Sequence, residues 1–179
     1  IQYLKNGIVI YKIWYQNNET HRDNDKPASI SYYGNGFFQR EQWFKNGSFS
    51  RDDNKPDSIL YYETRNGIKK DETWRRFEDS KLNENILFNV CYFEEGYKKE
   101  ESWYRQIGSD LPTHIGFYKN GNLEYEKWWK NNRIHRDKNH LPASIVYYEN
   151  KNGNIKFEAW FEDGLLIKST KRYENGVLK

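Results

Sequence analysis

The chain has 179 residues, of which 29 are basic and 26 acidic, and its formal net charge is +3 at pH 7. A nucleic-acid-binding protein typically shows a strong basic excess, so no nucleic-acid partner is favoured. Aromatic residues make up 18% of a chain that is only 36% hydrophobic, which excludes intrinsic disorder and predicts a core built largely from rings.

A single cysteine excludes an internal disulfide, and no apolar stretch is long enough for a membrane helix, so we expect an intracellular location. The chain contains no methionine, and Ile1 lies inside a repeat, so we expect a longer native protein.

An internal repeat organises the chain, because six glycines each lie seven residues before a tryptophan. The pairs are Gly7 and Trp14, Gly36 and Trp43, Gly67 and Trp74, Gly96 and Trp103, Gly121 and Trp128, and Gly153 and Trp160. Successive tryptophans are 25 to 32 residues apart. We therefore expect a single array of six units, roughly 1–33, 34–62, 63–93, 94–118, 119–148 and 149–179.

Each unit reads as two strands. Residues 1–7 resemble the end of a strand and a turn, and residues 8–15 form a strand rich in β-branched and aromatic side chains. A loop over residues 16–27 leads to a strand over 28–33. The tight turn Gly34-Asn35-Gly36 then returns the chain into a strand over 37–44, which holds Trp43.

Asn-Gly pairs separate the two strands of the hairpins, at Asn35-Gly36, Asn66-Gly67, Asn120-Gly121 and Asn152-Gly153. This pair predicts a two-residue turn in which both residues have a positive φ. Such short connections place sequential strands side by side and antiparallel. We therefore predict an all-β fold, an elongated antiparallel meander of about eleven or twelve strands. The strand pattern is compatible both with a curved sheet and with a half-barrel. Only residues 77–88 carry a weak helical pattern.

Three loop triplets share an Arg-Asp pair: His21-Arg22-Asp23, Ser50-Arg51-Asp52 and His135-Arg136-Asp137. The histidine forms resemble the catalytic loop of protein kinases, but the chain has neither an Asp-Phe-Gly motif nor a glycine-rich phosphate loop. A recurring loop motif favours a structural role, in which the aspartate caps a turn and the arginine lies on a tryptophan ring or pairs with a glutamate. We predict a protein that is not an enzyme and carries no cofactor.

Metal binding is also not favoured. The acidic runs Asp23-Asn24-Asp25 and Asp52-Asp53-Asn54 lack the glycine and distal glutamate of a helix-loop-helix calcium site. The four histidines, His21, His114, His135 and His140, have no zinc-ligand spacing, and Cys91 reads as a small filler on a strand.

A glutamate lies two residues before five of the tryptophans: Glu41, Glu72, Glu101, Glu126 and Glu158. A row of like charges across a sheet would be destabilising without partners. Lys70, Lys99 and Lys156, two residues before their glutamates, could supply them from the same face; alternatively each glutamate accepts from an indole N–H or a tyrosine hydroxyl.

The six tryptophans are interpreted as core, with a glycan or peptide platform as the alternative. Structural roles are assigned to Trp14, Trp43, Trp74, Trp103, Trp128, Trp160, Gly36, Gly67, Gly96, Gly121, Gly153, Arg22, Asp23, Arg51, Asp52, Arg136 and Asp137. Exposed rings are expected where the aromatic pattern doubles, so the predicted interaction surface is Trp128, Trp129, Tyr147 and Tyr148.

The run from Trp128 to Asp137, followed by Leu141-Pro142-Ala143, resembles MORN-type repeats in the variant that occurs in giant DNA viruses of amoebae. The resemblance implies a hairpin array that acts as a scaffold, and a location in the virion or the host cytoplasm. We expect a protein partner, or self-association. The alternatives are a carbohydrate-binding aromatic array and a peripheral phospholipid-binding module.

Overall fold

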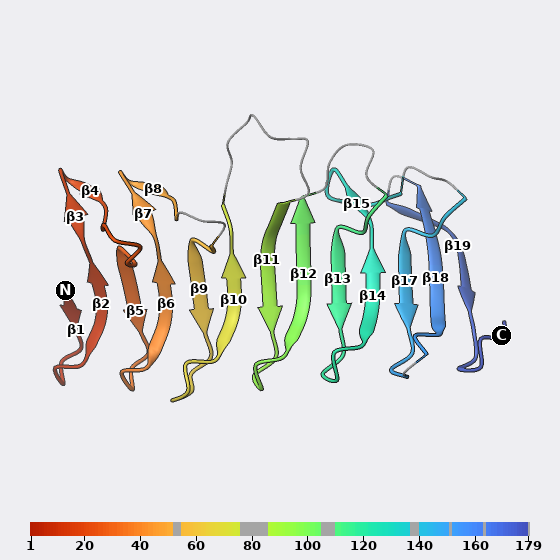
Figure 1. The fold of residues 1–179 in the computed structure, drawn as a ribbon, viewed down its shortest axis with the longest axis horizontal. Coiled ribbons are helices and arrows are strands. Elements are labelled where there is room, and N and C mark those ends of the chain that lie inside the picture. Colours follow the sequence, from red (N-terminus) through yellow and green to blue (C-terminus); the bar gives the residue numbers. More distant parts are fainter. Residues whose placement is uncertain are drawn as a thin grey trace. The chain divides into compact units, whose positions relative to one another are not determined.

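The computed structural model describes residues 1–51, 55–75, 86–104, 110–136, 140–150, 152–162 and 164–178. The described residues form an all-β fold with one main sheet of thirteen antiparallel strands, which does not close into a barrel (Figure 1). The hydrogen-bonded order is β1-β2-β5-β6-β9-β10-β11-β12-β13-β14-β17-β18-β19, which confirms the predicted meander. The thirteen strands are β1 (Gln2–Tyr3), β2 (Val9–Ile13), β5 (Ser29–Tyr32), β6 (Phe38–Gln42), β9 (Ser58–Tyr61), β10 (Lys69–Thr73), β11 (Ile86–Tyr92), β12 (Lys98–Tyr104), β13 (His114–Phe117), β14 (Leu123–Lys127), β17 (Ser144–Tyr147), β18 (Ile155–Glu162) and β19 (Leu165–Lys171).

The chain divides into two compact units. Unit 1 comprises residues 1–78 and 88–96, and unit 2 comprises residues 79–87 and 97–179. Within each unit the glycine turns lie at one end of the strands (Figure 1). Residues 86–88 of the segment with the weak helical pattern belong to β11, and residues 77–85 lie outside the described part. The described residues include no helix that could span a membrane.

The glycine turns differ from the predicted geometry. Gly36 has a φ of +85°, but Asn35 does not have a positive φ, so this is not the expected two-residue turn. Tyr33 N–H donates to Phe37 O and Gly36 N–H to Tyr33 O, which defines a three-residue loop that ends in a left-handed glycine. The asparagine acts through its side chain instead, because Asn35 Oδ1 accepts from Phe37 N–H at 3.1 Å.

A bulge follows the turns at Gly7, Gly36, Gly67, Gly121 and Gly153, and it changes which side chains share a face. Tyr61 is opposed by Lys69 and Leu60 by Asp71, so Lys70 is the extra residue. The predicted pairing of Lys70 with Glu72 is therefore wrong: the Lys69 ammonium contacts Glu72 at 2.6 Å, and Lys70 lies over the Tyr62 ring. Lys156 is likewise the bulged residue of its hairpin and lies over the Tyr148 ring rather than beside Glu158. In the fourth repeat the glutamate again contacts the lysine three residues earlier, Lys98 to Glu101 at 2.5 Å.

The segment between tryptophan and proline was expected to be a loop, but it holds a second, smaller hairpin. Three such ribbons are described: β3 (Tyr15–Gln16) with β4 (Glu19–Thr20), β7 (Phe44–Lys45) with β8 (Ser48–Phe49), and β15 (Trp129–Lys130) with β16 (Arg133–Ile134). Their turns are Asn17-Asn18, Asn46-Gly47 and Asn131-Asn132, and all six residues have a positive φ. The two-residue turn that asparagine and glycine favour thus occurs here, at the opposite end of the strands from the bulged turns.

Strand register assigns the two faces of the sheet. Directly opposed residues share a face, and Ile30, Glu41, Ile59, Glu72 and Val90 oppose one another in turn across unit 1. We call this the Ile/Glu face. Each glutamate is thus flanked by an aliphatic residue on the neighbouring strand rather than by another glutamate, which limits the repulsion that a continuous acidic row would cause.

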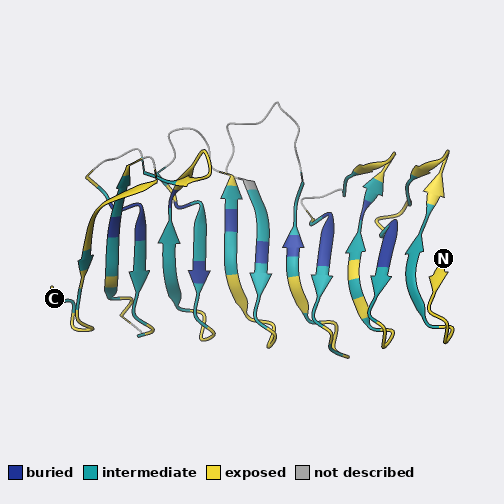
Figure 2. Ribbon diagram, turned by 180° about the vertical axis from the view of Figure 1, so that it is seen from behind, coloured by how far each residue is buried: buried dark blue, intermediate teal, exposed yellow. Residues whose placement is uncertain are grey.

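The opposite face of the same strands carries small polar side chains. Ser29 and Ser58 lie there and are buried, with exposed fractions of 3% and 5%, and Ser144 on β17 of unit 2 is likewise buried at 7%. The buried segments lie toward the ribbon ends of the strands, and the glycine turns are exposed (Figure 2). The aromatic core was only partly predicted, because Trp43 and Trp128 are buried, whereas the other buried apolar residues are Ala28, Ile30, Ile59, Val90, Ala143 and Ala159.

Candidate functional site

A cluster that we call the clamp joins neighbouring repeats at the ribbon end of the sheet. In the second repeat the Arg51 guanidinium lies 3.7 Å above the Trp43 ring, and its Nη1 donates to Pro56 O at 3.2 Å. Its other edge donates to the Asp25 carboxylate of the first repeat, with distances of 2.7 Å from Nε and 3.2 Å from Nη2. The Trp43 indole N–H donates to Asp25 O at 3.1 Å, so one aspartate accepts through its backbone and its side chain. Such a bidentate, stacked arginine is fixed in orientation by several partners at once.

The fifth repeat contains the same clamp. Arg136 lies 3.9 Å above Trp128, donates to Pro142 O at 3.1 Å, and contacts the Asp110 carboxylate of the fourth repeat at 2.9 Å. The Trp128 indole N–H donates to Asp110 O at 2.9 Å. The predicted structural role of the Arg-Asp motif is thus supported for the arginine, which stacks on tryptophan; Asp52 and Asp137 lie outside the described residues.

The clamp has an electrostatic signature at Asp25. The hydrogen bonds from Arg51 lower the pKa of the Asp25 carboxyl from 3.8 to about 2, with a further contribution from the Lys55 ammonium at 2.9 Å. Favourable charge pairing outweighs the partial burial that would otherwise raise this pKa. The carboxylate is therefore ionised at every pH above about 3.

A second set of contacts joins the repeats through the tyrosine pairs. The first tyrosine of a pair donates to a glutamate on the preceding strand, as Tyr61 does to Glu41 at 2.5 Å and Tyr147 to Glu126 at 2.6 Å. Burial and the neighbouring Glu41 carboxylate raise the pKa of Tyr61. Glu41, Glu72 and Glu126 therefore accept from tyrosine hydroxyls, one of the two expected arrangements, whereas Glu158 accepts from Thr170 and Arg172. The indole N–H groups of Trp43, Trp128 and Trp160 donate to loop carbonyls.

The second tyrosine of each pair reaches forward to the next repeat. Its hydroxyl donates to a backbone carbonyl at 2.7 to 2.8 Å, in the pairs Tyr33 to Tyr61, Tyr62 to Tyr92, Tyr118 to Tyr147 and Tyr148 to Arg172. The residues that define the repeat in sequence are therefore largely engaged in holding one repeat to the next.

The four residues of the predicted interaction surface occupy different environments. Trp128 is buried in the clamp at 7% exposure, and the hydroxyls of Tyr147 and Tyr148 are bonded within the sheet. Trp129, on ribbon β15–β16, is 38% exposed, and its ring lies 5.7 Å from that of His114, whose pKa is lowered by burial. The structure thus separates Trp129 from the other three as a surface ring.

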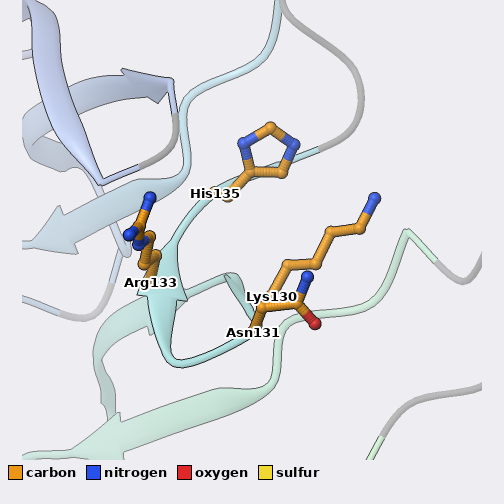
Figure 3. A pocket seen from close by; sticks show the side chains of 4 residues that line it. All are labelled: Lys130, Asn131, Arg133 and His135. Carbon is orange, nitrogen blue, oxygen red and sulfur yellow. The ribbon is translucent and has the colours of Figure 1, made fainter.

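The same ribbon borders a hollow of about 520 Å³ that is lined by Lys130, Asn131, Arg133 and His135 (Figure 3). Among the described residues, its lining carries two cationic side chains and no carboxylate. Elsewhere, the part of the chain that the structure describes has no group of three or more His, Cys, Asp or Glu arranged for a metal ion. Cys91 is half-buried, with its Sγ 3.2 Å from Asn89 Oδ1, on the strand where it was expected.

Sequence reasoning missed Asp25 and Asp110 as clamp residues. The sequence does contain a pattern that marks them, because each of these aspartates lies two residues before a proline, Pro27 and Pro112. His140 lies at the same position before Pro142, and its carbonyl accepts from the Trp160 indole at 3.2 Å. The residue two before proline is thus the acceptor for the next tryptophan in all three cases.

Comparisons of the chain with family models, curated proteins and solved structures find no match. The MORN-type resemblance therefore stays a hypothesis that rests on the residues quoted for it.

Proposed function

We propose that the protein is a non-enzymatic repeat scaffold that binds another protein through the aromatic side chains of its ribbons. The supporting observation is that the aromatic residues fall into two groups, those that contact a neighbouring repeat and those that are exposed to solvent. The repeated tryptophans and tyrosines hold the repeats together, whereas the residue after the tryptophan is exposed in two of the described ribbons: Tyr15 at 62% and Trp129 at 38%. Exposed aromatic residues at non-structural positions are typical of protein interaction surfaces.

Trp129 is the residue on which we expect most of the binding energy to depend. Its backbone pairs with Ile134 on ribbon β15–β16, and tryptophan is among the residues most enriched at interaction hot spots. A role in a virion or an infected cell, including self-association, belongs to this proposal through the MORN-type resemblance alone.

The test is a cross-linking pull-down from the native source with the wild-type chain and with Trp129→Ala. Trp128 is left intact, because removing a buried clamp ring would disturb the fold. The matched control is Leu166→Ala, which removes an apolar side chain that is 58% exposed elsewhere in unit 2. We expect one discrete protein partner, at least tenfold depleted by Trp129→Ala and retained by Leu166→Ala, with unchanged circular dichroism. Equal recovery from both variants would contradict the assignment of the surface.

One observation favours the phospholipid alternative, namely the cationic lining of the hollow beside ribbon β15–β16. Lysine and arginine near an anionic membrane each contribute about 1 kcal/mol to binding. Co-sedimentation with phosphatidylserine vesicles that is lost in 0.5 M salt and in Lys130→Gln/Arg133→Gln would favour this alternative. A change in tryptophan fluorescence on a glycan panel, without either of the other signals, would favour the carbohydrate alternative.

A further inference from the structure

The seven Asn-Gly pairs of the chain share a chemical reactivity. The backbone nitrogen of the glycine can attack the side-chain amide carbon of the asparagine and close a five-membered ring, because glycine has no side chain that hinders the approach. This attack is slow where the glycine N–H is held in a hydrogen bond or the asparagine side chain cannot rotate toward it. The pairs are Asn6-Gly7, Asn35-Gly36, Asn46-Gly47, Asn66-Gly67, Asn120-Gly121, Asn152-Gly153 and Asn175-Gly176.

Six of the seven glycine amides are held by a backbone hydrogen bond. Gly36 N–H donates to Tyr33 O at 2.9 Å, and Gly47 N–H donates to Thr20 O at 3.0 Å. The other four donate to backbone carbonyls at 2.8 to 3.2 Å, and they are Gly7, Gly121, Gly153 and Gly176. An amide proton that is bound to a carbonyl is harder to remove, so these six nitrogens are poor nucleophiles.

The asparagine side chain is also fixed in the four turns that have three residues. Asn35 Oδ1 accepts from Phe37 N–H at 3.1 Å. The same contact with the residue after glycine occurs at Asn6, Asn120 and Asn175, at 2.9 to 3.2 Å. It directs the side-chain oxygen away from the glycine nitrogen, so the side chain must break this bond before the ring can close.

The turn at Gly67 has neither restraint. Its loop comprises five residues, 63–67, in place of three. Among the described residues, the Gly67 N–H and the Asn66 side chain make no hydrogen bond of normal geometry. The Thr64 hydroxyl in the same loop is buried, and it too has no partner within the described part of the chain. Asn66 and Gly67 are exposed, and nothing lies within 4 Å of the position that a Cβ would take at Gly67, so the Asn66 side chain has room to turn.

We propose that Asn66 is a site of spontaneous deamidation, at which the Gly67 nitrogen attacks the Asn66 amide carbon. The bond from nitrogen to Cγ forms, the Cγ–Nδ2 bond breaks, and Nδ2 leaves as ammonia with the proton of the Gly67 N–H. Water then opens the cyclic imide at the side-chain carbonyl to give aspartate, or at the backbone carbonyl to give isoaspartate. Either product adds one negative charge, and isoaspartate also lengthens the backbone of the turn by one carbon. The modification lies between β9 and β10 and does not depend on the proposed scaffold function.

The experiment compares the seven pairs within one chain. Folded chain and chain unfolded in guanidinium chloride are incubated at pH 8 in H₂¹⁸O and then digested with pepsin, because acid slows further imide formation. Mass spectrometry measures the fraction of each asparagine that has exchanged its amide nitrogen for ¹⁸O. In the folded chain Asn66 should convert at least fivefold faster than the other six, the factor that one backbone hydrogen bond provides. Asn152 should be second, because the bond of Gly153 is the longest of the six and the Asn152 side chain makes none among the described residues. In denaturant the seven rates should agree within about twofold, because the hydrogen bonds that distinguish them are lost.

A shortened turn tests the cause. Replacing residues 63–67 by Gly-Asn-Gly, the sequence of residues 34–36, should restore the three-residue turn and its glycine hydrogen bond. The asparagine of the new turn should then convert as slowly as Asn35, whereas the rate at Asn152 should not change, and circular dichroism verifies that the variant is folded. The proposal is overturned if Asn66 does not lead in the folded chain, or if the order of the rates is the same in denaturant. A folded variant whose shortened turn still deamidates at the rate of Asn66 would also overturn it. Trp129→Ala should leave every rate unchanged, which separates a failure here from a failure of the scaffold assignment.

Discussion

The clamp between Asp25 and Arg51 makes a quantitative prediction about stability. A carboxyl pKa that is lowered from 3.8 to about 2 corresponds to at most about 2.5 kcal/mol of stabilisation. The Asp25 side chain is 36% exposed, so solvent screening reduces this ceiling, and we expect a coupling energy of about 1 kcal/mol at pH 7. The appropriate perturbation is a double-mutant cycle of Asp25→Asn and Arg51→Gln, because Arg51 also stacks on Trp43 and contacts Pro56.

The pH dependence of this coupling has a defined sign. Because the folded-state pKa is below the unfolded value, the stabilisation is fully present above about pH 4 and is lost as the pH falls through 3.8 toward 2. Urea unfolding followed by tryptophan fluorescence would measure the cycle at pH 7 and at pH 2.5. Asp23→Asn is the matched control, since that carboxylate lies in the same loop, is 69% exposed and contacts only His21 among the described residues. A coupling below about 0.3 kcal/mol at pH 7, or one that is equal at the two pH values, would refute this account.

Three further predictions concern single side chains. Tyr61→Phe should lower the free energy of unfolding by about 1–2 kcal/mol, because the half-buried Glu41 carboxylate loses its donor. The stability of the wild-type protein should fall above pH 10, because the unfolded state releases the Tyr61 proton at a lower pH than the folded state does. Alkaline difference spectroscopy should accordingly show that Tyr61 ionises at a higher pH than an exposed tyrosine. Gly116→Ala should cost about 1–3 kcal/mol in urea unfolding, since its Cβ would lie 2.2 Å from the Tyr125 ring; a Tyr125→Ala background that fails to relieve this cost would count against the contact. Gly36→Ala should lower stability by about 1 kcal/mol through its φ of +85°, and an unchanged Tm would argue against the bulged turn.

Several features of the fold followed from the sequence because they depend on local periodicity. Alternating β-branched and aromatic residues, punctuated by glycine at a fixed distance from tryptophan, determined the antiparallel hairpin array and the order of its strands. The recurrence of the Arg-Asp pair in three repeats was also sufficient to expect a structural arginine that lies on a tryptophan ring, as Arg51 does on Trp43, because a recurring loop motif favours a structural role.

The errors arose where one inserted residue reverses the side-chain pattern. Because Lys70 is an extra residue in β10, the strict alternation of side chains fails at this point of the strand. Spacing alone therefore paired Lys70 with Glu72, whereas the structure pairs Lys69 with it. The ribbons were missed because the segment between tryptophan and proline was interpreted as a loop, although Asn46 and Gly47 both have a positive φ and form a two-residue hairpin turn. A turn's φ values depend on the closing hydrogen bonds, which the sequence does not display.

The sequence by itself determined the class of fold, the repeat length and the absence of a recognisable catalytic motif, because these are properties of residue type and spacing. Tertiary structure alone decided which aromatic residues are structural and which are surface. Trp128 and Trp129 are adjacent and chemically identical, yet one is 7% and the other 38% exposed. The difference arises because alternation along the backbone directs one ring into the Arg136–Asp110 clamp and the other away from it. That clamp requires an aspartate from the preceding repeat, and only folding brings the two together.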